Sequence, residues 1–178
     1  KDFGKMLRGT TSLAIASAIE LNEDAAINWA LSVELMHNAS LVHDDVCDED
    51  SQRRHNPTIF ANFGAPLAIC FGDWLVAKSF EHAALAAKKS KGDTSGIITL
   101  LSNVMAKLSS GQAREFSGGP ILDWVGYDNV VNGKTVPLLA AAVEGPLVLA
   151  NQYQFFDDIK RCIESLGIGY QISNDILD

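Results

Sequence analysis

The acidic segment that begins at Asp44 is the part of the sequence best suited to chemistry. Five of the seven residues from Asp44 to Asp50 are acidic, and two arginines, Arg53 and Arg54, follow shortly after. Like charges this close repel one another, so the segment is either a solvated surface or a place where something strongly positive binds. The carboxylates could hold a metal ion, and guanidinium groups bind phosphate oxygens in pairs.

The spacing of the aspartates indicates which of them could share a ligand. Asp44 and Asp48 lie four residues apart, so on a helix they share a face, whereas Asp45 lies about 100° round the axis. Two carboxylates one turn apart suit Mg²⁺, which often binds one or two carboxylates together with substrate phosphates. The same face continues through Ser40 and Met36, which predicts that it leads into the protein. From spacing alone, a solvated helix end whose charges the arginines merely neutralise stays open.

The rest of the chain predicts helices. Apolar residues recur at helical spacing, and alternating strand patterns are absent. Asn22, followed by Glu23 and Asp24, has the properties of an N-cap and first turn. The expected helices cover residues 22–48, 67–89, 97–116, 127–131, 135–150 and 155–178, with a polar loop at 90–95 and a turn at 117–120. The residues expected in the core include Trp29, Trp74 and Trp124. We therefore predict an all-α fold, formed by a single domain over residues 1–178.

Composition excludes several classes of function. The net charge is −8 and the pI is near 4.9, which argues against nucleic acid or an anionic membrane as the main partner. The longest apolar run, 136–150, is short for a membrane span and contains Glu144, so we expect no transmembrane segment. Three cysteines without disulfide or zinc spacing predict buried thiols and a cytoplasmic location; they are Cys47, Cys70 and Cys162. The chain begins without Met and ends within a helical pattern, so we expect further sequence at both ends.

Short motifs along the whole chain match those of a known protein family. The segment LVHDDVCDEDSQRRHNPT is similar to a DDxxD motif followed by paired arginines and Pro-Thr. Five other segments match further landmarks in order: GKMLRG, ELMHNASLVHDD, FGDWLVAKSF, GKTVPLL and GYQISNDILD. In this combination the sequence resembles the trans-isoprenyl diphosphate (polyprenyl) synthases. The resemblance implies the isoprenoid synthase fold, a bundle of long antiparallel helices around a central cavity.

The resemblance also implies roles for individual residues. The implied ligands of isopentenyl diphosphate are Lys5, Arg8, His37 and Arg54. The implied contacts of the allylic diphosphate are Arg53, Lys134, Thr135 and Gln171. The implied ligands of Mg²⁺, with three ions expected per active site, are Asp44, Asp48, Asp175 and Asp178. The residues implied in catalysis are Asp44, Asp45, Asp48, Lys134 and Asp175. Asn174 departs from the family pattern, which usually has Asp there, and offers an oxygen ligand without a negative charge.

A reaction and a product follow from the same resemblance. Mg²⁺ and cationic side chains neutralise the leaving allylic diphosphate, geranyl or farnesyl diphosphate, and the double bond of isopentenyl diphosphate attacks the allylic cation. In this family, bulky aromatic residues four or five positions before the first Asp shorten the product. Here those positions are Ser40 and Ala39, both small. We expect a product of geranylgeranyl length or longer, with Met36 or residues of neighbouring helices as the tunnel floor, and a homodimeric enzyme.

Two other functions stay open. A class I terpene cyclase has a second metal motif that begins Asn-Asp, as at Asn174-Asp175, but it has Ser where this chain has Asp178. A cyclase also has no use for an isopentenyl diphosphate site. A non-catalytic subunit that tunes an active partner usually loses the aspartates, whereas the first motif is complete here. Asn174 is the residue that keeps both alternatives open.

Overall fold

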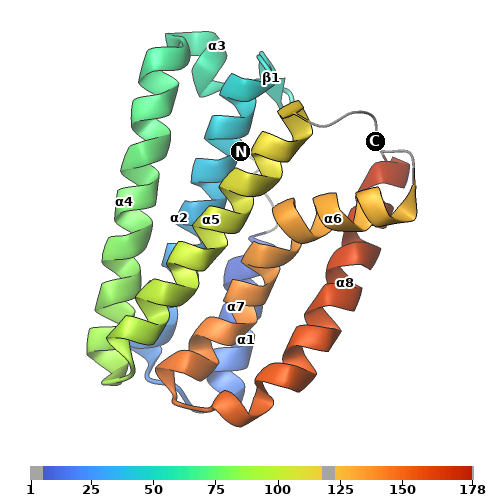
Figure 1. The fold of residues 1–178 in the computed structure, drawn as a ribbon. Coiled ribbons are helices and arrows are strands. Elements are labelled where there is room, and N and C mark those ends of the chain that lie inside the picture. The colour runs from blue at the N-terminus through green and yellow to red at the C-terminus, as the bar shows by residue number, and fades with distance from the viewer. Residues whose placement is uncertain (1–5, 118–122, 178) are drawn as a thin grey trace.

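The computed structural model describes residues 6–117 and 123–177 and shows a bundle of helices (Figure 1). The helices are α1 (Leu7–Ala18), α2 (Glu23–Cys47), α3 (Ile59–Phe63), α4 (Ala65–Ser90), α5 (Thr94–Ser117), α6 (Trp124–Lys134), α7 (Val136–Leu149) and α8 (Phe156–Leu177). The short elements are the antiparallel strands β1 (Gln52–Arg53) and β2 (Asn56–Pro57) and the 3₁₀ turn η1 (Tyr153–Phe155). The predicted all-α fold is confirmed.

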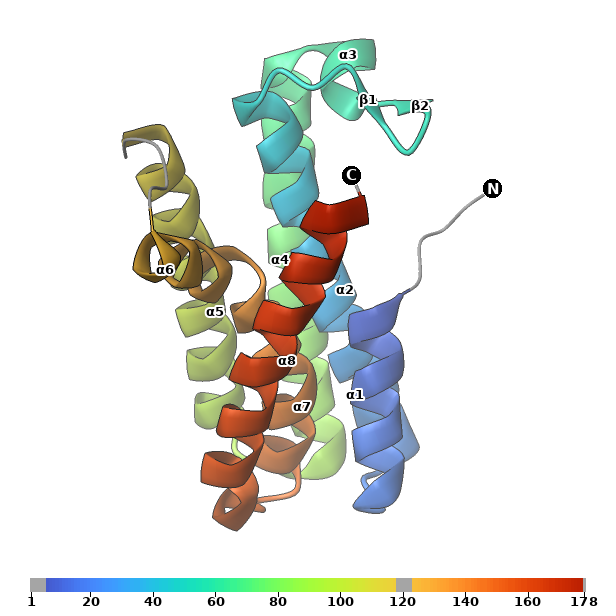
Figure 2. The same ribbon diagram turned by 90° about the vertical axis from the view of Figure 1, so that its right-hand side faces the viewer.

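Helices α2 and α4 run antiparallel and side by side, connected by the hairpin and α3 (Figures 1 and 2). Ser32 of α2 and Ser79 of α4 hold them together, since each hydroxyl donates to the other residue's backbone carbonyl at 2.8 Å. Both serines are buried, and their small size lets the two helices approach closely. Helix α6 crosses between α5 and α8 (Figure 1). Residues of α4 and α5, together with Lys134 of α6, line one cavity with the end of α2.

The start of α2 lies where the sequence predicted it. The Asn22 Oδ1 accepts a hydrogen bond from the backbone N–H of Ala25 at 3.0 Å, and Glu23 and Asp24 occupy the first turn. The helix expected over 127–131 is longer, because Asp123 caps it through the Gly126 N–H at 2.8 Å. This cap extends α6 by a turn at its start.

Helix α1 and the hairpin were not predicted, because neither has a local signal. The Gly9 N–H in α1 donates to Glu34 Oε1 of α2 at 2.7 Å, a tertiary contact. The hairpin turn places Arg54 and His55 at φ 51° and 62°. Turns of this kind usually carry Asn-Gly, whose absence hid the hairpin.

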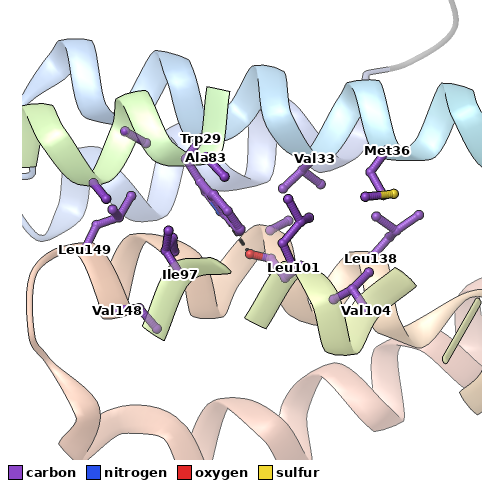
Figure 3. Close-up of a cluster of buried hydrophobic side chains, with 14 residues drawn as sticks. Trp29, Val33, Met36, Ala83, Ile97, Leu101, Val104, Leu138, Val148 and Leu149 are labelled. Carbon is purple, nitrogen blue, oxygen red and sulfur yellow. Dashed lines mark hydrogen bonds between the residues drawn. The ribbon is translucent and has the colours of Figure 1, made fainter. Parts of the chain in front are cut away.

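The largest core cluster surrounds Trp29 and joins α2, α4, α5 and α7 (Figure 3). Its labelled members are Trp29, Val33, Met36, Ala83, Ile97, Leu101, Val104, Leu138, Val148 and Leu149. The indole is fully buried, and its Nε1–H donates to the Ala141 carbonyl at 3.0 Å. A Cβ at Gly145 would lie 1.9 Å from the ring, so this glycine provides the space that the indole fills.

Two of the tryptophans predicted in the core are instead on the surface. Trp74 is 52% exposed on α4 and stacks on Phe71, with ring centroids 5.9 Å apart. Trp124 is 61% exposed at the start of α6. The thiols predicted to be buried are also exposed; they are Cys47, Cys70 and Cys162. Residue type misled in each case, because the position lies on an outward face of its helix.

The described ranges contain no helix that combines the length and the hydrophobicity needed to cross a membrane. Helix α7, which is buried at nearly every position, has 14 residues and includes Pro137 and Pro146. Its hydrophobicity is explained by its central place between α1, α5 and α8. The apolar run at 136–150 therefore belongs to a helix that packs inside the protein.

The packing of the Trp29 indole against Gly145 leads to a stability prediction. We expect Gly145→Ala to lower the free energy of unfolding by about 3 kcal/mol, because the new methyl group overlaps the buried indole. Urea denaturation followed by tryptophan fluorescence measures the change. Gly169→Ala is the control, since a Cβ at Gly169 meets nothing within 4 Å. Equal stability of the Gly145 variant and the control would show that the indole does not need this space.

Candidate functional site

A cavity of about 340 Å³ lies between α2, α4 and α5 and reaches the end of α6. The lining residues are Met36, Ala39, Ser40, His43, Asp44, Cys47, Val76, Met105, Leu108, Ser109, Gln112, Ala113, Phe116 and Lys134. Five of the predicted site residues therefore share one space. The cavity has charged groups, Asp44 and Lys134, at one end, and Met36 lies about two helical turns away along α2.

The two ends of the cavity differ in character. Asp44 is half-buried near the end of α2, whereas Met36 and Ala39 are buried, at 2% and 1% exposure. Val76 and Met105 contribute further apolar surface from α4 and α5. A ligand that fits this space has a charged group at the Asp44 end and a hydrocarbon portion along α2.

The surroundings of Asp44 raise its pKa overall. Burial raises the pKa of Asp44, Lys134 lowers it, and Asp48, one turn further along, raises it. Asp48 is exposed at the C-cap of α2, where its backbone N–H donates to the Asp44 carbonyl at 2.8 Å. The two carboxylates thus lie one helical turn apart at the end of α2, and a bound cation would relieve their repulsion.

A close crossing of α5 and α6 places Lys134 at the cavity. A Cβ at Gly111 would lie 2.8 Å from the Gly133 carbonyl oxygen, so the two backbones touch. Lys134 directly follows this contact and forms an ion pair with Glu115 of α5. Thr135, the next residue, is buried at the junction with α7. The Gly-Lys-Thr segment therefore positions a cation by helix packing.

Asp45 and Arg53 pair with each other. The Arg53 Nε donates to Asp45 Oδ1 at 2.7 Å, and Nη2 lies at the same distance from that oxygen. The Asp45 side chain is 7% exposed, and it does not line the cavity. This pair of a half-buried arginine and a buried aspartate connects the hairpin to the end of α2. The catalytic role predicted for Asp45 and the contact predicted between Arg53 and the allylic diphosphate stay predictions.

Positive charge gathers at His37 from two other segments. Burial and then the charges of Arg8, Arg54 and Arg53 lower the pKa of His37 to about 3. The imidazole is therefore neutral at ordinary pH and can still donate one hydrogen bond. Arg8 comes from α1, and Arg53 and Arg54 come from the hairpin. The charges of these arginines act on His37, and guanidinium groups are the side chains that bind polyanions in pairs of hydrogen bonds.

The donor set agrees with Mg²⁺ bound together with phosphate. Within residues 6–117 and 123–177, no group of three or more His, Cys, Asp or Glu side chains converges into an all-protein metal cage. Mg²⁺ usually keeps several waters and takes one or two carboxylates plus substrate phosphates. Asp44 and Asp48, close enough to shift a pKa, fit that pattern.

The second predicted motif lies at the end of α8. Gln171, Asn174 and Asp175 belong to the last turns of this helix. Lys5 and Asp178 lie outside the described residues. The roles predicted for these residues stay predictions.

Three residues at the site were missed in the sequence. Gln112 of α5 and His43 of α2 line the cavity, and Glu115 pairs with Lys134. Gln112 had a usable signal, since it interrupts an apolar stripe that runs at helical spacing from Met105 to Phe116. Glu115 had none, because only the crossing of α5 and α6 brings it to Lys134.

Comparisons with known proteins identify the family of this chain. The sequence model of the polyprenyl synthetase family matches residues 1–178, and the chain belongs to this family. It is 36% identical over 182 residues to a geranylgeranyl diphosphate synthase of Saccharolobus solfataricus, covering 98% of this chain and 54% of that protein. It is 35% identical over 153 residues to a short chain isoprenyl diphosphate synthase of Methanocaldococcus jannaschii, covering 84% of this chain and 46% of that protein.

Solved structures give the same fold. The geranylgeranyl pyrophosphate synthetase of Geoglobus acetivorans superposes with a TM-score of 0.87 at 32% identity, covering 100% of this chain and 59% of that one. A decaprenyl diphosphate synthase of Rhodobacter capsulatus gives 0.87 at 29% identity, covering 98% and 53%. The predicted isoprenoid synthase fold is confirmed. The chain spans about half the length of the curated relatives it matches.

The environment of His37 leads to a pH prediction. Its pKa falls from 6.5 to about 3 on folding, so below pH 6.5 the unfolded chain binds a proton that the folded chain does not. Stability is therefore lost as the pH falls through this window, by at most about 1.4 kcal/mol per pH unit. We expect His37→Gln to flatten this dependence in urea titrations at pH 7 and pH 5. His55→Gln, at an exposed histidine, controls for loss of an imidazole. An unchanged slope in the His37 variant contradicts the assignment.

Proposed function

We propose that this protein condenses isopentenyl diphosphate with an allylic diphosphate to give a trans-polyprenyl diphosphate. The observation that carries the proposal is one cavity with Asp44 and Lys134 at its charged end and Ser40 and Met36 along its wall. An allylic diphosphate needs this combination, because it is a polyanion joined to a hydrocarbon chain. The match to the polyprenyl synthetase family over residues 1–178 supports the same activity.

In this proposal the allylic diphosphate lies at the charged end of the cavity. Asp44 and Asp48 hold Mg²⁺ there, Asp45 supports them through Arg53, and Asp175 and Asp178 complete a set for three ions. Mg²⁺, when bound, neutralises charge on the diphosphate as it leaves. The further side chains assigned to this diphosphate are Arg53, Lys134, Thr135 and Gln171. Lys134 supports the assignment because its charge already acts on Asp44.

Isopentenyl diphosphate binds at the positive cluster around His37. Arg8 and Arg54 supply charge, the neutral imidazole donates a hydrogen bond, and Lys5 adds a further cation. The separation of this cluster from the cavity lining supports two diphosphate sites, because Arg8, His37 and Arg54 do not line the cavity. Two substrates can then be held at once with their hydrocarbon parts facing each other.

The reaction breaks the bond between the allylic carbon and the diphosphate oxygen, and the electron pair leaves with the diphosphate. The double bond of isopentenyl diphosphate attacks that carbon and forms a carbon–carbon bond. Loss of a proton then produces an allylic diphosphate one isoprene unit longer. Lys134 stabilises the charge that develops on the leaving group, and no residue acts as a nucleophile.

The product is of geranylgeranyl length or longer, made from geranyl or farnesyl diphosphate. Ser40 and Ala39 are small and line the cavity next to Asp44. Met36 follows one turn below Ser40, buried in the core cluster, and forms the floor. The relatives named above include enzymes for geranylgeranyl and decaprenyl products, so the cavity lining is the better guide to length.

A terpene cyclase and a non-catalytic subunit are the alternatives. The positive cluster at His37 favours condensation over cyclisation, because a cyclase binds a single diphosphate. The complete first motif favours an active enzyme over a regulatory subunit. Asn174 is the one residue that favours either alternative, since it removes a charge from the second motif.

We also propose a homodimer in the cytoplasm. Helix α4 exposes a stripe of apolar side chains that includes Leu67, Phe71 and Trp74, and a second copy would bury it. The three cysteines are free and exposed, which suits a reducing compartment. The size of the protein in solution, measured by light scattering, tests the dimer directly.

One assay separates the three functions. The protein is incubated with Mg²⁺, farnesyl diphosphate and labelled isopentenyl diphosphate, with EDTA as the control. We expect label in a longer prenyl diphosphate, and its loss with EDTA. A hydrocarbon released without label would instead identify a cyclase. Turnover that appears when a partner subunit is added, and is absent without one, would identify a regulatory subunit.

Ser40 provides the test of product length. We expect Ser40→Phe to shorten the main product, because the phenyl ring fills the cavity one turn below Asp44. Chromatography of the dephosphorylated products measures the change. Ser102→Phe is the matched control, since Ser102 is exposed on α5 and does not line the cavity. An unchanged product spectrum in the Ser40 variant would show that Ser40 does not line the space that holds the prenyl chain.

A further inference from the structure

His43 and Gly72 form a contact whose role the proposed function does not explain. His43 lies on α2 directly before Asp44, and its side chain reaches α4. A Cβ at Gly72 would lie 2.2 Å from His43 Nε2 and 2.5 Å from Cδ2. The imidazole therefore occupies the volume that any side chain at position 72 would take.

The same imidazole forms part of the cavity wall. His43 lines the cavity together with Ser40, one turn before it on α2, and Val76, one turn after Gly72 on α4. The ring thus lies between the backbone of α4 and the cavity. The position of the His43 ring against α4 therefore sets the width of the cavity beside α2.

Packing against the glycine, rather than hydrogen bonding, holds the ring in place. The Nε2 atom is buried and has no hydrogen-bond partner in the part of the chain that the structure describes. It lies 3.4 Å from Asp73 Oδ1, and that carboxylate is 69% exposed. Exposed pairs of this kind contribute little. The space above Gly72 is the dominant constraint on the ring.

We propose that the contact between His43 and Gly72 is a determinant of product length. This rests on the proposed prenyl-chain elongation. Gly72 has no side chain that could contact the substrate. Its effect is indirect, because the missing side chain leaves room for the His43 ring to pack against α4. Any side chain at position 72 moves the imidazole away from α4, and the cavity is the space on its other side.

The expected effects have opposite signs. Gly72→Ala moves the ring into the cavity and shortens the main product by about one isoprene unit, since a close-packed wall has no room to absorb the shift. His43→Ala removes the ring and lengthens the product by about one unit. In the double variant the alanine at position 72 meets no ring, so the product is as long as that of His43→Ala. This rescue distinguishes displacement of the ring from a general effect of Gly72→Ala on α4.

Product length is measured with farnesyl diphosphate, isopentenyl diphosphate and Mg²⁺. Gly169→Ala controls for the higher helix propensity of alanine, because its Cβ would lie in open space. Thermal unfolding checks that each variant is folded. If Gly72→Ala does not fold, His43→Ala and the double variant still test the sign and the rescue.

Binding of non-reacting ligands tests the same proposal without enzyme turnover. Calorimetry with linear alkyl diphosphates of increasing length, in the presence of Mg²⁺, gives the length beyond which affinity no longer rises. We expect that limit to shorten in Gly72→Ala and to lengthen in His43→Ala. If the wild type does not elongate a primer but the limits shift this way, the proposed function fails, and His43 still sets the length of alkyl chain that the cavity holds. Limits and product lengths that match the wild type in both single variants overturn the inference, as does shortening that persists in the double variant.

Discussion

The contact of the α5 and α6 backbones at Gly111 and Gly133 is the constraint on which the site depends. The two glycines bring the helices closer than any pair of side chains would allow, and Lys134 is the next residue along the chain. Its ammonium group consequently meets the charge of Asp44, which burial alone would make costly. Lys134, which forms an ion pair with Glu115, thus offsets part of the cost of burying Asp44 at the end of α2.

Close packing at a glycine also occurs away from the charged groups. Trp29 lies where Gly145 has no side chain, and His43 lies where Gly72 has none. In each case a large ring of α2 fills a gap in the opposite helix. Helix α2 thus presents its rings to α7 and α4, while its small residues, such as Ser40, face the cavity. The cavity lies beside the small side chains of Ala39 and Ser40, and the His43 ring forms part of its wall.

Sequence periodicity could identify what one helix face contains, but not what meets it. Ser40 and Asp44 share a face through helical spacing, and they line the same cavity. The pairing of Asp45 with Arg53 depends on an unsignalled hairpin, and the place of Glu115 depends on a crossing of two helices. Trp74 was assigned to the core by residue type, yet its face of α4 is exposed. The failures at Arg53 and Glu115 share a cause, since each depends on a contact between distant segments.

The hairpin turn has a consequence for how the arginines behave. Arg54 and His55 adopt left-handed backbone conformations, which cost about 1 kcal/mol each for residues other than glycine. The hairpin keeps this shape because Arg53 is held by Asp45 and because the Thr58 hydroxyl donates to the Asp50 carbonyl at 2.7 Å. Arg53 and Arg54 are neighbours in the segment that these two contacts fix, so the same contacts set the backbone position of both arginines.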